Sequence, residues 1–354
     1  MLIDQEQLIE QPAVVAEGQN LIKACLFNLI IIAEDVEAAM HCQELVRIIT
    51  EKFPCRIIFV RIDKTAQSDF LQLTRSVQIV GAGATSICCD QIAIDASLNQ
   101  SHKIPFIIFP QIVPDLPVYI LLSKDPTKET LPFLQKYATR VIFDVPAVEN
   151  YGRFSEQLLA LLQHNALDYV DMHWARTKAW REVLAKVFAT REQINELTLS
   201  KMIQITYVAT PGVSRYKPEM EAVYLQAWLA TRLQWELLSV IREENAIRLS
   251  YKWNNTSISV SLIPKDTGIL DQGALFSFEA MSYNESHVLI THETESKHVI
   301  VHASDLKQCQ MPYALFLANY QKGPALVAEI FYQPVSGHYA EALKLLCHKE
   351  WAGK

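Results

Sequence analysis

The stretch PVYILLSKDPTKETLPFLQKYATRVIFDV, residues 117–145, predicts a strand, a helix and a second strand in succession. The apolar run at residues 118–122 is typical of a strand that is covered on both faces. Residues 128–138 suit a helix, and residues 141–143 suit the next strand. The dipeptide Asp125-Pro126 marks a turn before the helix. This alternation favours a parallel or mixed sheet that is flanked by helices.

The residues before this stretch extend the same pattern. An apolar run at residues 27–33 predicts another covered strand. Asp35 can then cap a helix that ends near Pro54, and residues 56–62 and 85–94 predict further strands. The apolar positions of that helix fall on one side and are Val36, Ala39, Met40, Val46 and Ile49.

The second half of the chain has a different pattern. It predicts a helix at residues 178–188 and a long helix from about Pro218 to Arg242, where the proline suits a first helical turn. Apolar and polar residues then alternate through residues 247–253 and 258–262, on either side of an Asn254-Asn255 turn. Similar short runs continue to residue 301, so we expect an antiparallel meander with one wet face.

The length of 354 residues favours two domains. We expect an α/β N-terminal domain over residues 1–167, in which a helix at residues 154–162 closes the layer. An α+β C-terminal domain, with the meander and Trp- and Arg-rich helices, is expected over residues 168–354.

Composition excludes several classes of partner. The net charge is −7 and Lys and Arg are spread along the chain, which argues against a nucleic-acid partner. The two most apolar segments, residues 21–33 and 104–122, are too short or too rich in proline to predict a membrane span. The acidic first twenty residues do not resemble a signal peptide, so we expect a cytoplasmic protein.

The sequence contains few of the motifs that are typical of catalytic or phosphate-binding sites. It has only 10 glycines and contains neither a G-x-x-x-x-G-K-[ST] phosphate loop nor a G-x-S-x-G nucleophile elbow. The one glycine-rich piece, residues 81–85, lacks a third glycine and precedes a strand, so we interpret it as a turn. We expect His292, His298 and His302 to be exposed strand residues, not metal ligands. No catalytic residue, cofactor or metal is therefore predicted.

The seven cysteines form no C-x-x-C pair and are predicted to be reduced thiols. Cys88 and Cys89 are adjacent on a predicted strand, so their side chains point to opposite faces. We expect Cys89 to face the core and Cys88 to face a neighbouring helix, with neither acting as a redox switch.

Two segments combine tryptophan with arginine. In DMHWARTKAWR, residues 171–181, Trp174, Arg176, Trp180 and Arg181 lie at the entry of a helix whose N-cap we expect to be Thr177. They either brace a domain junction or form a contact surface, since Trp and Arg are enriched at interface hot spots. We favour bracing for Arg176 and partner contact for Arg181.

The second such segment lies on the long helix. Tyr224, Trp228, Arg232 and Trp235 follow spacings of four, four and three residues and would share one face. An arginine between two tryptophan rings can stack on them, so Arg232 is not expected to be freely solvated. A core stripe and a contact surface are both compatible with this pattern.

Five motifs occur in an order that resembles a known family. They are NLIIIAED (28–35) followed by PCR (54–56), CDQIAID (89–95), PDLPV (114–118), DMHWAR (171–176) followed by WR (180–181), and LQAWLATR (225–232). Together they are similar to the glucose-6-phosphate dehydrogenase assembly protein family, OpcA, over residues 28–240. Two departures are the Thr177-Lys178-Ala179 sequence, where the family has Thr-Pro, and Ala227, where it has Gly.

The resemblance implies a non-catalytic protein that binds glucose-6-phosphate dehydrogenase and promotes its oligomerisation or activity in the oxidative pentose phosphate pathway. It would act as an allosteric effector by binding one state of the enzyme preferentially. The alternatives are a sugar-phosphate or nucleotide-binding enzyme that uses a cleft of the α/β domain, and a structural subunit with another partner. The candidate partner-binding residues are Trp174, Arg176, Trp180, Arg181, Trp228, Arg232 and Asp115.

Overall fold

The computed structural model divides the chain into two compact units. Unit 1 comprises Met1–Val145, His164–Asp171 and Leu326–Gln333, and unit 2 comprises Pro146–Gln163, Met172–Ala325 and Pro334–Lys354. The residues that the structure describes are 8–10, 20–33, 36–50, 53–80, 85–123, 132–145, 148, 150–164, 167–210, 217–268, 270–293, 296–306, 309–317 and 337–351.

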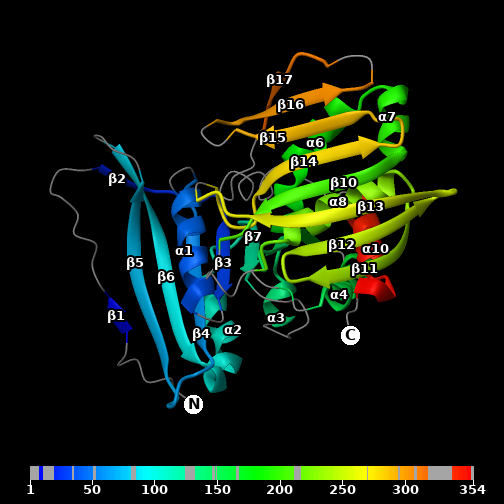
Figure 1. The fold of residues 1–354 in the computed structure, drawn as a ribbon. Coiled ribbons are helices and arrows are strands. Elements are labelled where there is room, and N and C mark those ends of the chain that lie inside the picture. Colours follow the sequence, from blue (N-terminus) through cyan, green and yellow to red (C-terminus); the bar gives the residue numbers. More distant parts are fainter. Residues whose placement is uncertain are drawn as a thin grey trace. The chain divides into compact units, whose positions relative to one another are not determined.

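Unit 1 is built on a nine-stranded mixed sheet in the order β1-β5-β6-β4-β3-β7-β8-β9, with β2 also paired to β6. Only the β5–β6 pair is antiparallel among the pairs described. The strands are β1 (Leu8–Glu10), β2 (Asn20–Lys23), β3 (Asn28–Ala33), β4 (Arg56–Asp63), β5 (Leu71–Val80), β6 (Thr85–Ser97), β7 (Val118–Leu122), β8 (Arg140–Phe143) and β9 (Asp168–Asp171) (Figure 1). The helices are α1 (Val36–Thr50), η2 (Leu98–Lys103), α2 (Ile104–Ile108), η3 (Phe109–Gln111) and α3 (Pro132–Gln135).

The centre of this sheet confirms the predicted α/β class. All six residues of β3 are buried, as the apolar run requires of a strand between two layers. On α1, Ala39, Val46 and Ile49 are buried, but Met40 is 65% exposed, so its placement on the apolar side was wrong. The predicted cap Asp35 and the turn at 125–126 lie outside the described residues.

Unit 2 is built on an eight-stranded sheet in the order β11-β12-β13-β10-β14-β15-β16-β17. Its pairs are antiparallel except β10–β13, which confirms the predicted meander. The strands are β10 (Ser200–Val208), β11 (Glu236–Glu243), β12 (Ala246–Trp253), β13 (Thr256–Lys265), β14 (Leu275–Ser282), β15 (His287–His292), β16 (His298–Ser304) and β17 (Tyr313–Phe316). The helices are α4 (Tyr151–His164), α5 (Met172–Arg176), α6 (Lys178–Val187), α7 (Arg191–Thr198), α8 (Met220–Arg232), α10 (Gly337–Leu346) and η4 (Lys349–Trp351).

The helices of unit 2 pack on one another and on its sheet. Helix α8 contacts β10 and β13, α10 contacts α8, and α7 contacts β14 (Figure 1). The other face of the sheet is exposed to solvent, as the alternation along β12 shows. Ile247, Leu249 and Tyr251 are buried, and the residues between them are not. Asn254 has a φ of 52° in the predicted turn, a conformation that asparagine tolerates.

The predicted long helix at residues 218–242 is shorter in the structure. Helix α8 ends at Arg232, Gln234 has a φ of 56°, and residues 236–243 form β11. The apolar residues of that segment fit either period, and pairing with β12 decides in favour of the strand. Trp235 therefore lies in the connection, where it is buried with its ring 6.0 Å from that of Tyr251.

The position of α4 differs from the expectation. The helix predicted at residues 154–162 groups with unit 2, although it was assigned to the N-terminal domain. A division into two folding domains at residues 167/168 stays a prediction.

Every helix in the described part of the chain is too short or too polar to cross a membrane.

Candidate partner-binding sites

Arg181 on α6 lies against Trp174 on α5. Its guanidinium carbon is 3.8 Å from the centroid of the indole ring, and Nη2 donates to the Trp174 carbonyl at 3.3 Å. A cation over a tryptophan face stabilises by roughly 0.5–2 kcal/mol, depending on burial. The side chain predicted to contact a partner is thus already engaged within its own unit.

The other residues of this segment are core residues. Trp174 is 7% exposed, Arg176 is 3% exposed and Trp180 is 2% exposed, so they have little surface for a partner. The bracing of a domain junction by Arg176 stays a prediction. Thr177 occupies the N-cap position of α6 as expected, but its side chain makes no capping hydrogen bond, because its hydroxyl donates to the Trp174 carbonyl, 2.7 Å away.

The stripe on α8 ranges from buried to exposed. Tyr224 is fully buried, Trp228 is partly buried, and Arg232 is exposed at the end of the helix. The expectation that Arg232 is shielded was therefore wrong, because Trp235 leaves the helix axis after the turn at Gln234. Trp228 and Arg232 keep surface with which a partner could interact.

Asp115 is exposed and has a φ of 64°. Its loop is held by the buried Asn28, whose Oδ1 accepts from the Val113 N–H at 2.8 Å and whose Nδ2 donates to the Val113 carbonyl at 3.1 Å. Because Asn28 begins β3, this loop lies at the amino-terminal edge of the sheet. Asp115 is therefore at the opposite edge from the carboxyl ends of the parallel strands.

The sheet of unit 1 has the strand order of a dinucleotide-binding fold, in which the ligand binds at the carboxyl ends of the strands. The parallel strands β6-β4-β3-β7-β8-β9 follow the pattern 3-2-1-4-5-6, with the crevice expected between β3 and β7. Such sites need glycines after the first strand so that the pyrophosphate can approach the backbone. Here β3 ends at Ala33 and α1 begins at Val36, and the residues between them in sequence are Glu34 and Asp35. The sequence between β3 and α1 therefore lacks the glycine that such a site needs.

The histidines differ in their surroundings. His298 and His302 are exposed as expected. His292, the last residue of β15, is only 2% exposed, so the expectation of an exposed side chain was wrong for this residue. Burial lowers the pKa of His292, although the adjacent Glu293 opposes the shift. Within the described ranges, no group of three or more His, Cys, Asp or Glu residues is placed to hold a metal ion.

This burial predicts a pH dependence of stability. Because the pKa of His292 is lower in the folded chain, the unfolded chain binds more protons below about pH 6.5. Stability is therefore present above this pH and is lost as the pH falls toward the folded pKa. We expect denaturant unfolding to show a smaller drop from pH 7.5 to 5.5 for His292→Gln than for the wild type. Equal drops would contradict this assignment.

The cysteines follow the expected pattern in part. Cys89 is 3% exposed, which confirms its place in the core, and Cys88 is half-buried. Burial raises the pKa of the Cys55 and Cys89 thiols, which disfavours the reactive thiolate. The absence of redox switching stays a prediction.

The sequence reasoning missed an exposed aromatic cluster in unit 1. Phe106 is 72% exposed, and Phe109, Phe133 and Tyr137 are each at least 40% exposed. Phe109 and Tyr137 meet edge to face at 4.7 Å, and Phe133 lies 5.3 Å from Tyr137. The spacing of Phe106 and Phe109 is visible in the sequence, but only the fold brings them to Phe133 on α3 and to Tyr137 after it.

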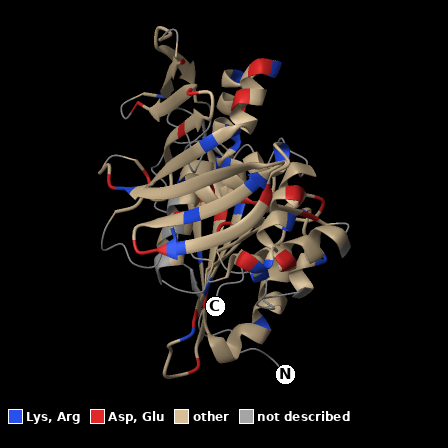
Figure 2. Cartoon of the chain, turned by 45° about the vertical axis from the view of Figure 1, so that its right-hand side comes forward, with Lys and Arg blue, Asp and Glu red and all other residues tan. Residues whose placement is uncertain are grey.

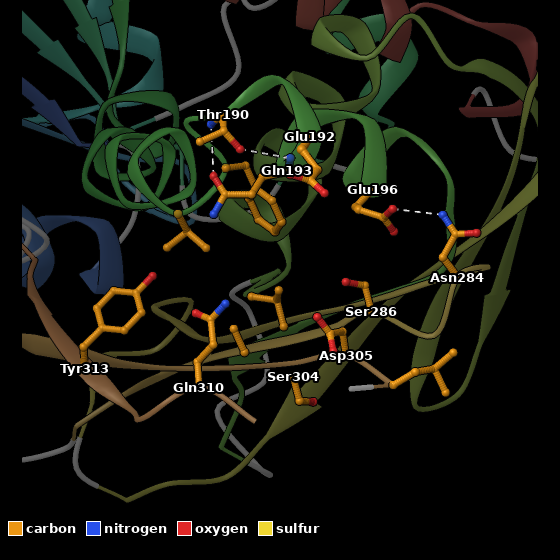
Figure 3. Close-up of a pocket in the computed structure, with 15 residues that line it drawn as sticks. Thr190, Glu192, Gln193, Glu196, Asn284, Ser286, Ser304, Asp305, Gln310 and Tyr313 are labelled. Carbon is orange, nitrogen blue, oxygen red and sulfur yellow. Dashed lines mark hydrogen bonds between the residues drawn. The ribbon is translucent and has the colours of Figure 1, made fainter. Parts of the chain in front are cut away.

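Unit 2 contains an open pocket of about 550 Å³ beside α7, shown in Figure 3. One wall comes from α7 and its N-cap, and the other comes from the β14–β15 turn and the segment between β16 and β17. The polar residues that line it are Thr190, Glu192, Gln193, Glu196, Asn284, Ser286, Ser304, Asp305, Gln310 and Tyr313. They come from three segments that are far apart in the sequence, and no local pattern marked them.

Comparisons with known proteins agree with the motif order. Residues 46–160 match the family model of the glucose-6-phosphate dehydrogenase subunit N-terminal domain, and residues 168–309 match the corresponding C-terminal domain. A protein of Synechocystis sp., described as a candidate OxPP cycle protein OpcA, is 28% identical over 52% of this chain and 38% of its own length. A protein of Synechococcus elongatus with the same description is 26% identical over 55% of this chain and 43% of its own length. The matched region thus spans about two fifths of each relative.

One solved structure with a similar fold is KijD10, a 3-ketoreductase from Actinomadura kijaniata in complex with TDP-benzene and NADP. It matches 90% of this chain and 94% of its own, with a TM-score of 0.52 and 8% sequence identity, which shows the fold alone. The family models, by contrast, cover both halves of the chain in order. The chain therefore belongs to the glucose-6-phosphate dehydrogenase assembly protein family, OpcA.

Proposed function

We propose that this chain is a non-catalytic binding partner of glucose-6-phosphate dehydrogenase that promotes the assembly or activity of the enzyme. The observation that carries the proposal is the match of both family models, each described as part of a glucose-6-phosphate dehydrogenase subunit. The proposed location is the cytoplasm, where the chain would encounter and bind the dehydrogenase. The chain would shift the enzyme toward the state that it binds more tightly.

The dehydrogenase would be activated without a contribution of catalytic groups from this chain. Support comes from the crossover after β3, which lacks glycine and carries Glu34 and Asp35. A connection without glycine at this point is poorly suited to the close approach of a pyrophosphate to the backbone. The acidic and basic residues are interspersed over strands and helices of the chain, as Figure 2 shows, which fits a protein partner better than a nucleic acid.

An activity titration tests this proposal. Purified dehydrogenase is assayed for NADPH formation while the chain is added from substoichiometric amounts to excess. We expect the rate to rise and to saturate, and we expect the chain alone to produce no NADPH. A rate that stays constant up to a tenfold excess would contradict the proposed role.

A nucleotide-binding enzyme is the second candidate, because the strand order of unit 1 is that of dinucleotide-binding sheets. Calorimetric titration with NADP and with glucose 6-phosphate separates the two functions. We expect neither to bind at millimolar concentration. Saturable NADP binding together with turnover by the chain alone would favour the enzyme.

A further inference from the structure

The pocket beside α7 is negatively charged. Its described lining contains the carboxylates of Glu192, Glu196 and Asp305 and contains no Lys, Arg or His. An anionic ligand such as a sugar phosphate or a nucleotide would be repelled by these three groups. A cation would be attracted to them, and the surrounding amides and hydroxyls could accept its remaining hydrogen bonds.

Glu196 supplies an acceptor that is shielded from solvent. Its Oε1 accepts from Asn284 Nδ2 at 2.9 Å, across the pocket from α7 (Figure 3). Its Oε2 is buried and has no hydrogen-bond partner among the described residues. A buried carboxylate oxygen without a donor is costly, and a charged donor from outside would relieve this cost.

The other polar groups beside it are partly satisfied. Thr190 and Gln193 form a reciprocal capping box at the start of α7, so they hold the helix in place. The carboxylates of Glu192 and Asp305 take no part in that box. Glu192 and Glu196 are therefore presented by a helix whose first turn is fixed, whereas Asp305 comes from the segment after β16.

Two exposed side chains, Leu306 and Tyr313, line the acidic pocket on the side of β17, and the exposed Met311 follows the lining residue Gln310 in sequence. Leu306 is 74% exposed, Met311 is 88% exposed and Tyr313 is 41% exposed. Tyr313 also begins β17, the outermost strand of the sheet in the described order. A protein surface would cover these side chains, whereas a free small cation would leave them in water.

We propose that this pocket receives an arginine side chain of a partner protein, whose neighbouring apolar residues cover Leu306, Met311 and Tyr313. The planar guanidinium has five donors, enough to serve carboxylates on both walls of the pocket at once. The partner is the dehydrogenase if the proposed function holds, and this identification rests on that function.

The test compares variants with a matched control. Glu196→Gln and Asp305→Asn, alone and together, remove the charge at nearly constant shape. Glu244→Gln removes one charge from an exposed residue of the β11–β12 turn in the same unit. Dissociation constants for purified dehydrogenase are measured at 50 and 300 mM NaCl, and thermal melting confirms that each variant is folded.

We expect the double variant to bind at least tenfold more weakly at low salt and Glu244→Gln to bind within twofold of the wild type. The wild-type affinity should fall at high salt, and that of the double variant should change less. A double variant that is folded and binds as tightly as the wild type would overturn the inference that the pocket receives an arginine of the partner. The proposed function would still stand.

If the wild type does not bind the dehydrogenase, the proposed function fails, and N-acetyl-arginine amide then tests the pocket separately. NMR shifts at pocket residues that are present in the wild type and lost in the double variant would support the inference. The lack of such shifts would overturn it. Binding of spermidine that depends on Glu196, with unchanged dehydrogenase affinity in the variants, would assign the pocket to a free polyamine and also overturn it.

Discussion

Replacing Trp174 with alanine is expected to lower the free energy of unfolding by about 3–5 kcal/mol, the usual cost of truncating a buried tryptophan. The side chain is 7% exposed, and its ring lies 6.0 Å from Tyr224 on α8 and 5.2 Å from Tyr339 on α10. Its removal would leave a cavity where three helices meet. Denaturant unfolding followed by circular dichroism measures the change.

Arg232→Ala is the control for this substitution, because Arg232 is exposed at the end of α8. We expect that variant to change stability by no more than about 0.5 kcal/mol. At a temperature at which the Trp174→Ala protein is still folded, that protein should activate the dehydrogenase as the wild type does. A Trp174→Ala protein with unchanged stability would show that this aromatic cluster does not hold the helices together.

Arg181→Ala is expected to lower the free energy of unfolding by about 1–3 kcal/mol, through the loss of the stacking on Trp174 and of the hydrogen bond to its carbonyl. Its affinity for the dehydrogenase should not change, because the guanidinium already lies over the indole ring. Thermal melting and titration against the enzyme measure the two quantities separately.

Arg181→Lys is the matched variant, since it keeps the charge and loses the planar group. We expect its stability to lie between those of the wild type and Arg181→Ala. An Arg181→Ala protein that melts like the wild type but binds the dehydrogenase at least tenfold more weakly would contradict bracing. It would place Arg181 in the contact surface, as its sequence position predicted.

The central strands of unit 1 could be predicted because a strand buried on both faces needs a continuous apolar run. Strands β3, β7 and β8 have such runs, and the structure places them side by side. Strand β5 was missed, because LQLTRSVQIV mixes polar and apolar residues as a half-exposed antiparallel strand does. Strand β11 was taken for helix, because only its pairing with β12 distinguishes the two.

The candidate sites show the same limit. The Trp and Arg residues of segment 171–181 could be singled out from composition, but their burial depends on α8 and α10, which are distant in sequence. The pocket joins Glu196, Asn284 and Asp305, which carry no local signal. The fold alone brings their polar groups together, so sequence periodicity could not predict this site.

Sedimentation velocity of the dehydrogenase, with and without this chain, tests the central claim most directly. The account predicts that the chain sediments together with the enzyme at micromolar concentrations and that the enzyme shifts toward its larger assembly. Glu244→Gln, which changes an exposed residue outside the candidate partner-binding residues, should preserve the complex. Separate sedimentation of the two proteins, with an unchanged distribution of the enzyme, would contradict the account.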